Sequence, residues 1–183
     1  LAYRRVKIIP SYKKIRYENQ FVMKVHKIAI FADVQNIYYT TRDVYGRSFN
    51  YRKLWQKIAK QGDIVSAFAY AIHKGDDQQI KFQDALKHIG FDVKLKPYIQ
   101  RMDGSAKGDW DVGIAIDVME AAASGDVDTI ILLSGDGDFD LLLKKVSQTY
   151  GMNTEVFGVS KLTAGSLIEA ADQYHPISQD LLM

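Results

Sequence analysis

Four aspartates stand beside apolar runs, where folding could bring their carboxylates together: Asp33, Asp111, Asp136 and Asp138. The first follows the run Ile28 to Ala32, and the last two follow the run Ile130 to Leu133. Asp111 opens a helical pattern and shares its stripe with Val118 and Ala122. A carboxylate on a stripe that packs against other elements needs a compensating partner.

Four carboxylates in one place favour a bound cation. Two such charges about 4 Å apart repel by about 1 kcal/mol in bulk water, and by about four times that near a protein surface. Oxygen ligands without His or Cys favour Mg²⁺ or Mn²⁺ over zinc. Because such an ion can activate water, orient a phosphate and neutralise a leaving oxygen, these residues predict phosphodiester hydrolysis.

The elements that must position these residues alternate between strands and helices. Apolar runs predict strands over 28–32, 64–72, 91–99, 127–133 and 154–159. Periodic patterns predict helices over 51–60, 76–89, 110–123, 139–150 and 162–171. This alternation predicts a three-layer α/β/α domain with a central, mostly parallel sheet. Ligands of such sheets bind at the carboxyl ends of the strands, so we expect the aspartates to meet at that edge.

Three separated blocks resemble the signatures of the NYN domain family, a PIN-like nuclease group that includes the LabA-like bacterial proteins. In chain order the blocks are Asp33-Val-Gln-Asn36, Lys107-Gly-Asp-Trp-Asp111-Val and Ser134-Gly-Asp136-Gly-Asp138-Phe. The resemblance covers about residues 27–160. It implies a PIN-like fold, a divalent-metal-dependent ribonuclease activity and RNA as the substrate.

The resemblance also implies roles for single residues. The implied catalytic and metal-binding residues are Asp33, Asp111, Asp136 and Asp138. Asn36 and Ser134 are implied to assist at the same edge in substrate binding, and Lys107, in a loop beside the acids, is a candidate phosphate contact. Asp117 stands where the family often has an acid, but on a helix it points about 120° away from Asp111, so it ranks below the other four.

Other interpretations of the same residues stay open. Asp136 could serve only as a helix N-cap, and Asp111 or Asp138 only as first-turn acids that the helix dipole favours. The segment 135–140 also fits the Gly-Asp-Gly-x-x-Asp block of haloacid-dehalogenase-like phosphatases, although Gln35 stands where that family has its general acid. A non-catalytic RNA- or protein-binding regulatory module on the same fold is a further alternative.

The stretch 38–53 interleaves aromatic and basic residues and predicts a connection that binds single-stranded RNA. Aromatic rings can stack on unpaired bases while basic side chains contact phosphates. About half of the aromatics fit core packing better. The residues are Tyr38, Tyr39, Tyr45, Phe49 and Tyr51 with Arg42, Arg47, Arg52 and Lys53.

The charge is divided unevenly along the chain. Residues 1–27 hold eight Lys or Arg against the single acid Glu18, whereas residues 103–140 hold ten acids and one base. We therefore expect a basic arm over 1–26 and a single NYN-like domain over 27–183. Either the arm contacts nucleic-acid phosphates, or Met23 is the biological start and the preceding residues are an appendage.

Composition excludes several classes of protein. A length of 183 residues fits one domain, and the absence of cysteine excludes a disulfide scaffold, thiolate zinc sites and thiol catalysis. It also agrees with a reducing compartment, so we expect a cytoplasmic protein. The longest apolar runs are too short to cross a bilayer. A homodimer is compatible with an RNA-cleaving function, since a lone shallow site holds a long substrate poorly.

Overall fold

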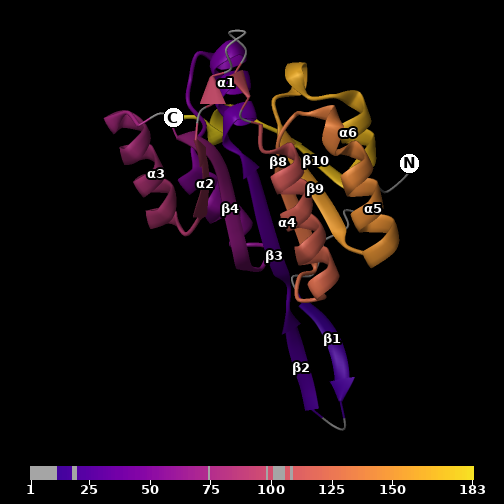
Figure 1. The fold of residues 1–183 in the computed structure, drawn as a ribbon. Coiled ribbons are helices and arrows are strands. Elements are labelled where there is room, and N and C mark those ends of the chain that lie inside the picture. Colours follow the sequence, from indigo (N-terminus) through magenta and orange to yellow (C-terminus); the bar gives the residue numbers. More distant parts are fainter. Residues whose placement is uncertain (1–11, 18–19, 74, 98, 101–105, 108) are drawn as a thin grey trace, which may run out of the picture.

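A six-stranded sheet forms the centre of the molecule (Figure 1). The computed structural model describes residues 12–17, 20–73, 75–97, 99–100, 106–107 and 109–183. The strand order is β10-β9-β8-β3-β4-β5, and each neighbouring pair runs parallel. The strands are β3 (Lys27–Asp33), β4 (Asp63–His73), β5 (Asp92–Pro97), β8 (Thr129–Leu133), β9 (Asn153–Gly158) and β10 (Gln173–Pro176).

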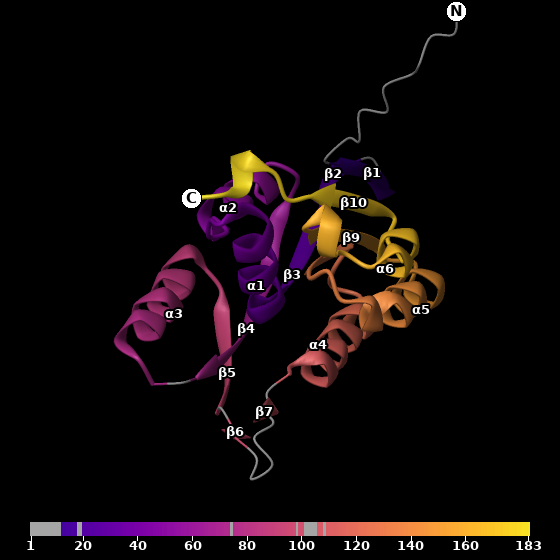
Figure 2. The same cartoon turned by 90° about the horizontal axis from the view of Figure 1, so that it is seen from above.

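Helices cover both faces of this sheet (Figure 2). On one face lie α1 (Val34–Tyr45), α2 (Tyr51–Ile58) and α3 (Asp77–Ile89). On the other lie α4 (Asp111–Ser124), α5 (Asp140–Tyr150) and α6 (Gly165–Ala170). Three short 3₁₀ turns accompany them, η1 (Gly137–Phe139), η2 (Ser160–Leu162) and η3 (Gln179–Leu181). The predicted three-layer α/β fold is therefore confirmed.

Alternating side chains of the central strands build one core on each face. Along β3, Ile28, Ile30 and Ala32 pack with α1, α2 and α3, whereas Ala29 and Phe31 pack with α4, α5 and α6. Strand β8 divides in the same way and is fully buried. Burial on both faces is why these two strands are unbroken apolar runs in the sequence.

The stretch after β3 is helical, where the sequence predicted a polar connection. Helix α1 buries Val34, Ile37 and Thr41 at the spacing of one helix face. The Thr41 hydroxyl donates to the Ile37 carbonyl oxygen at 2.7 Å, so its polar atom is satisfied inside the core. A buried threonine on the inward face hides the apolar period, which is why the prediction of a connection was wrong.

Three further strand pairings were not predicted. The edge strand β10 is only four residues long and includes polar side chains. The strand β6 (Ile99–Gln100), which begins at the last residue of the strand predicted over 91–99, pairs antiparallel with β7 (Ala106–Lys107), where a loop was predicted. In the predicted basic arm, β1 (Tyr12–Tyr17) and β2 (Gln20–Val25) form an antiparallel pair that projects beyond the amino end of β3 (Figure 1).

A membrane-spanning helix is not found within the described ranges, since none of their helices combines the necessary length with the necessary hydropathy.

Candidate metal centre

The carboxyl ends of β3 and β8 lie side by side at the point where the strand order reverses. Ala32 pairs with Leu133 in register, so Asp33 and Ser134 follow at the same level. In the sheet, β4 and β5 follow β3 on one side, whereas β9 and β10 follow β8 on the other side. Ligands of parallel sheets bind at such a switch point.

Asp33 is held at this edge with both carboxylate oxygens engaged. It is 8% exposed, and it accepts hydrogen bonds from the Asn36 backbone N–H at 3.1 Å and from the Ser134 hydroxyl at 3.3 Å. The pKa of Asp33 is raised to about 6, chiefly by burial and also by the charges of Asp111 and Asp136, while the two hydrogen bonds act in the opposite direction. A charged Asp33 is therefore costly unless a cation lies nearby.

The turn after β8 is fixed by side chains from the start of α1 and from the turn itself. The Asn36 side-chain oxygen accepts the Gly135 backbone N–H at 2.9 Å, and the Ser134 hydroxyl oxygen accepts the Asp136 backbone N–H at 3.2 Å. A Cβ atom on Gly135 would lie 2.7 Å from the Leu162 carbonyl oxygen, so the close approach of the two loops requires glycine. Asn36 and Ser134 thus set the position of Asp136.

The predicted N-cap role of Asp136 is confirmed, and it does not exclude a second role for the same carboxylate. Asp136 is the N-cap of η1, and its Oδ1 accepts the Asp138 backbone N–H at 3.0 Å. This bond also fixes the Asp136 carboxylate beside the Asp138 backbone. Capping and ligand binding are compatible, because a carboxylate has two oxygens and several lone pairs.

Asp111 is positioned by the tryptophan before it. Trp110 donates from its indole Nε1 to the Ala71 carbonyl oxygen of β4 at 2.9 Å, and its ring packs closely on Gly113. The pKa of Asp111 is raised by its partial burial first and then by neighbouring acids, among them Asp136 and Asp138. The start of α4 therefore presents its first carboxylate to the turn after β8.

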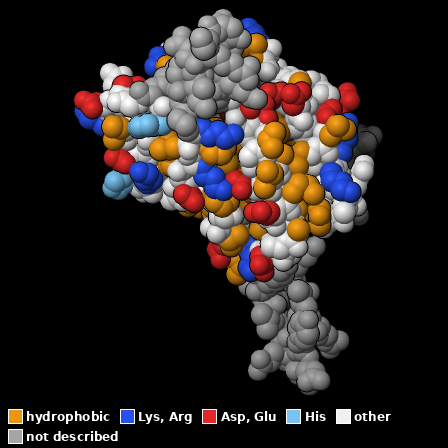
Figure 3. Space-filling view, viewed as in Figure 1, with side chains coloured by type: hydrophobic (Ala, Val, Ile, Leu, Met, Phe, Trp, Pro, Cys, Tyr) orange, Lys and Arg blue, Asp and Glu red, His pale blue; other side chains and the backbone are white. Residues whose placement is uncertain are grey.

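Three of the four predicted aspartates form a tight cluster. One carboxylate oxygen from each of Asp111, Asp136 and Asp138 lies within 4.8 Å of the others. Asp33 lies outside this trio but interacts electrostatically with two of its members. Acidic side chains gather above the upper end of α4 in Figure 3. Carboxylates at this separation could together hold a hard cation such as Mg²⁺ or Mn²⁺.

The second-ranked acid, Asp117, is not in the cluster. Its Oδ2 accepts from the Lys94 ammonium at 2.6 Å and from the Tyr70 hydroxyl at 2.7 Å. The helical geometry used in the sequence analysis therefore separated it correctly from Asp111. Its charge is already balanced by a lysine.

A lysine beside the cluster comes from β5 and was missed. Lys96 donates from Nζ to the Asp109 carbonyl oxygen at 3.0 Å, stacks over the Trp110 ring at 4.3 Å, and its charge lowers the pKa of Asp111 against the stronger upward influences. The signal was available, because Lys96 stands near the carboxyl end of a predicted strand. The predicted phosphate contact, Lys107, has its backbone in β7, and its side chain lies outside the described residues.

The loop after β9 also shapes the site and was missed. The Ala164 backbone N–H donates to the Gly135 carbonyl oxygen at 2.9 Å, and a Cβ on Gly137 would lie 3.0 Å from the Ala164 side chain. The rule that parallel strands end at a common edge would have pointed to this loop, although its small residues carry no chemical signal of their own.

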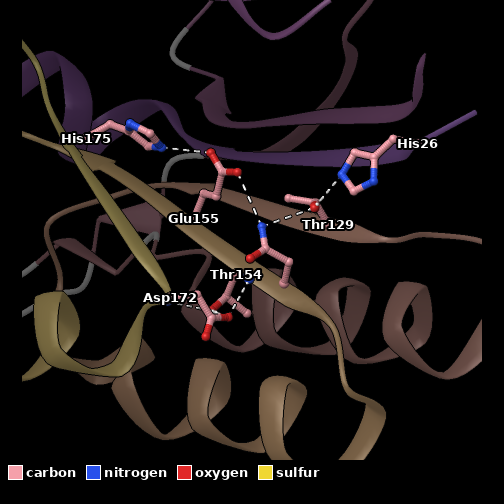
Figure 4. A network of polar contacts seen from close by, with 7 residues as sticks. His26, Thr129, Thr154, Glu155, Asp172 and His175 are labelled. Carbon is pink, nitrogen blue, oxygen red and sulfur yellow. Dashed lines mark hydrogen bonds and ion pairs between the residues drawn. The ribbon is translucent and has the colours of Figure 1, made fainter. Parts of the chain in front are cut away.

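A second group of acids lies on β9 and just before β10, with different surroundings (Figure 4). Glu155 accepts from His175 at 2.7 Å and from the Asn153 amide at 3.3 Å. Asp172 accepts from the backbone and hydroxyl of Thr154 at 2.8 and 2.9 Å. Each of these acids meets hydrogen-bond donors.

The arrangement at the switch point agrees with comparisons to known proteins. A family model for the NYN domain matches residues 27–178. The chain belongs to the NYN domain family. The low amplitude and bright protein LabA of Synechococcus elongatus is 30% identical over 158 residues, which cover 81% of this chain and 82% of LabA. The crystal structure of a protein of unknown function from Vibrio parahaemolyticus matches with a TM-score of 0.82 and 47% identity, over 92% of this chain and 100% of that one.

Membership of the NYN family confirms the resemblance drawn from the three sequence blocks. In this NYN domain the blocks end β3, begin α4 and follow β8. The fold brings them to one edge because β3 and β8 are neighbours and α4 packs across both on one face.

Proposed function

We propose that this NYN domain is a divalent-metal-dependent ribonuclease that hydrolyses RNA phosphodiester bonds. The observation that carries the proposal is the cluster of Asp111, Asp136 and Asp138 beside the buried Asp33. Family membership supports it, since NYN domains are grouped with the PIN-like nucleases.

The donor set fits a hard divalent cation. The three clustered side chains offer carboxylate oxygens, and neither histidine nor cysteine contributes to the described cluster. Such ligands suit Mg²⁺ or Mn²⁺. Asp111, Asp136 and Asp138 would hold the ion, and Asp33 would add its charge from the floor of the site. When bound, the ion supplies positive charge to the attacking and leaving oxygens of a phosphodiester.

The remaining residues of the site would keep the acids in place. The Ser134 hydroxyl bridges Asp33 and the backbone of Asp136, and Asn36 connects the start of α1 to the turn after β8. Lys96 would offset excess negative charge at the start of α4 and attract the phosphate backbone of RNA. Asn36 and Ser134 are thus proposed as positioning residues.

The test is cleavage of end-labelled RNA by a matched pair of variants. Single-stranded and hairpin RNAs are incubated with Mn²⁺, Mg²⁺ or EDTA and wild type, Asp136→Asn or Asp126→Asn. Asp126 is exposed and follows the far end of α4, so its variant makes the same charge change away from the cluster. We expect metal-dependent cleavage that Asp136→Asn lowers roughly 10²- to 10³-fold and Asp126→Asn leaves unchanged.

Two outcomes would overturn the proposal. RNA that binds without metal-dependent cleavage would favour the regulatory-module alternative. Release of inorganic phosphate from small phosphomonoesters, without cleavage of RNA, would favour the phosphatase.

A further inference from the structure

A cavity of about 510 Å³ lies between α2, α3 and the last residues of the chain. Its lining combines apolar side chains, among them Leu86, Ile89 and Leu182, with the basic Arg52 and Lys53. A volume of several hundred Å³ with a few convergent polar groups is typical of small-ligand sites. The cavity is separate from the aspartate cluster, since none of its lining residues belongs to it.

The cavity offers a partly exposed aromatic ring. Phe82 is 36% exposed, and its ring makes an edge contact with Tyr51 at a centroid distance of 5.9 Å. Tyr51 is buried and packs in turn on Phe49 and Phe91. The Phe82 ring thus rests on a packed aromatic group, which suits it to stacking against a planar ligand.

The charged side chains that line the cavity are basic. None of the described residues that line the cavity is acidic. Two acids of the neighbouring segments are already paired, Asp84 with Lys87 at 3.2 Å and Asp180 with Lys57 at 3.6 Å. An anion is therefore the complementary ligand.

The position of the two cations in α2 is itself unfavourable for the helix. Arg52 and Lys53 lie in the first turn, where the helix dipole favours acids, and α2 has no acid there. The helix dipole therefore does not favour these two cations. An anionic ligand would be attracted by both side chains, while the Lys53 backbone N–H already donates to the Asn50 Oδ1 at 3.0 Å.

The cavity also borders the aspartate site. Tyr51 lines the cavity, and its pKa is raised first by burial and then by the charge of Asp33. Asp33, beside the aspartate cluster, is therefore near one residue that lines the cavity.

We propose that this cavity binds one nucleotide of the RNA outside the aspartate cluster, with its base on Phe82 and its phosphate on Arg52 and Lys53. The inference rests on the proposed function in taking RNA as the ligand. It adds a second contact that would fix the position of the strand relative to the aspartates.

The test measures RNA binding in EDTA, where cleavage does not interfere. Fluorescence anisotropy of a labelled single-stranded RNA is recorded for wild type, Arg52→Ala/Lys53→Ala and the control Lys60→Ala/Lys145→Ala, which removes two exposed cations elsewhere. We expect the first double variant to weaken binding roughly tenfold or more and to reduce the salt slope by about 1 to 2, with a small effect of the control. Equal effects of the two double variants would overturn the inference.

A second comparison separates stacking from folding. Phe82→Leu keeps an apolar side chain and should weaken binding roughly fivefold or more, whereas Phe82→Tyr should retain it. Equal binding of RNA by Phe82→Leu and wild type would overturn the base contact. The same conclusion would follow if a poly-glutamate peptide bound as tightly as RNA and depended on the same residues. Binding that depends on Arg52 and Lys53 without any cleavage would remove the ribonuclease and leave this site intact. RNA cleavage with RNA binding that is unchanged by substitution of Arg52 and Lys53 would support the ribonuclease and remove this site.

Discussion

Asp111, Asp136 and Asp138 meet one another at the carboxyl edge of the sheet, whereas Glu155 and Asp172 meet donors on β9 and β10. The fold is the same parallel sheet in both places, and the residue types are nearly the same. In the second group each acid is balanced by histidine, threonine or asparagine within hydrogen-bond distance.

The difference separates acids that meet hydrogen-bond donors from acids that meet one another. A carboxylate that meets donors contributes to stability by itself, because removing it leaves those donors unpaired. Carboxylates that meet carboxylates cost stability until a cation binds. The following predictions test whether the two groups divide in this way.

The largest expected effect concerns two acids of α4. Asp111→Asn should lower metal-dependent RNA cleavage roughly 10²- to 10³-fold, since it removes a member of the cluster. Asp117→Asn, six residues further on, should change cleavage less than about threefold, because Asp117 is paired with Lys94 and Tyr70. Initial rates under matched RNA and Mn²⁺ concentrations measure both. A comparable loss in Asp117→Asn would show that a paired acid also serves catalysis.

The second prediction concerns the free energy of unfolding, for which the paired acids should matter more than the clustered ones. Glu155→Ala should lower the free energy of unfolding by about 2 to 3 kcal/mol, because the buried Glu155 accepts from both His175 and Asn153. Asp138→Ala should change it by less than about 0.5 kcal/mol, since Asp138 is exposed among like charges. Urea unfolding in EDTA measures both. If Asp138→Ala were the more destabilising of the two, the division would be wrong.

The strands that carry the candidate site were predictable from the sequence. The apolar runs before Asp33 and Ser134 are long and unbroken because both strands are buried on both faces. Their carboxyl ends, and with them Asp136 and Asp138, could therefore be placed at one edge. The helical stripe through Asp111 gave the third element.

The contacts that fix the site were not predictable in the same way. That Asn36 holds the backbone of Gly135 depends on a register between strands about a hundred residues apart. Helix α1 was missed because its inward face includes Thr41, and β10 because an edge strand of four residues has no distinct period. Lys96 stands near the end of a predicted strand, but its contacts with Asp109 and Trp110 at the start of α4 depend on the folded arrangement.

The third prediction uses the burial of Asp33. In EDTA its pKa is about 6 in the folded chain against 3.8 for an ordinary aspartate. Between these values the folded state holds a proton that the unfolded state has lost, so the free energy of unfolding falls as pH rises from about 4 to about 6, by up to about 3 kcal/mol. Asp33→Asn removes this fall. Urea unfolding across that range should show the variant more stable at pH 7 and the two proteins converging near pH 4; parallel curves would contradict the prediction.

The smallest effect is the response of thermal stability to metal. Mn²⁺ at about ten times its dissociation constant would stabilise the folded state by about 1.4 kcal/mol, which corresponds to about 3 to 5 °C for a chain of this length. Asp138→Asn should lose most of this shift, because one of the three clustered ligands is gone. Glu155→Gln should keep the shift although its midpoint in EDTA is lower, since its partners are hydrogen-bond donors on β9 and β10. Differential scanning calorimetry with and without Mn²⁺ separates the two quantities in each variant. If Mn²⁺ still raised the midpoint of Asp138→Asn but no longer raised that of Glu155→Gln, the ion would bind among the paired acids. The assignment of the two groups would then be wrong.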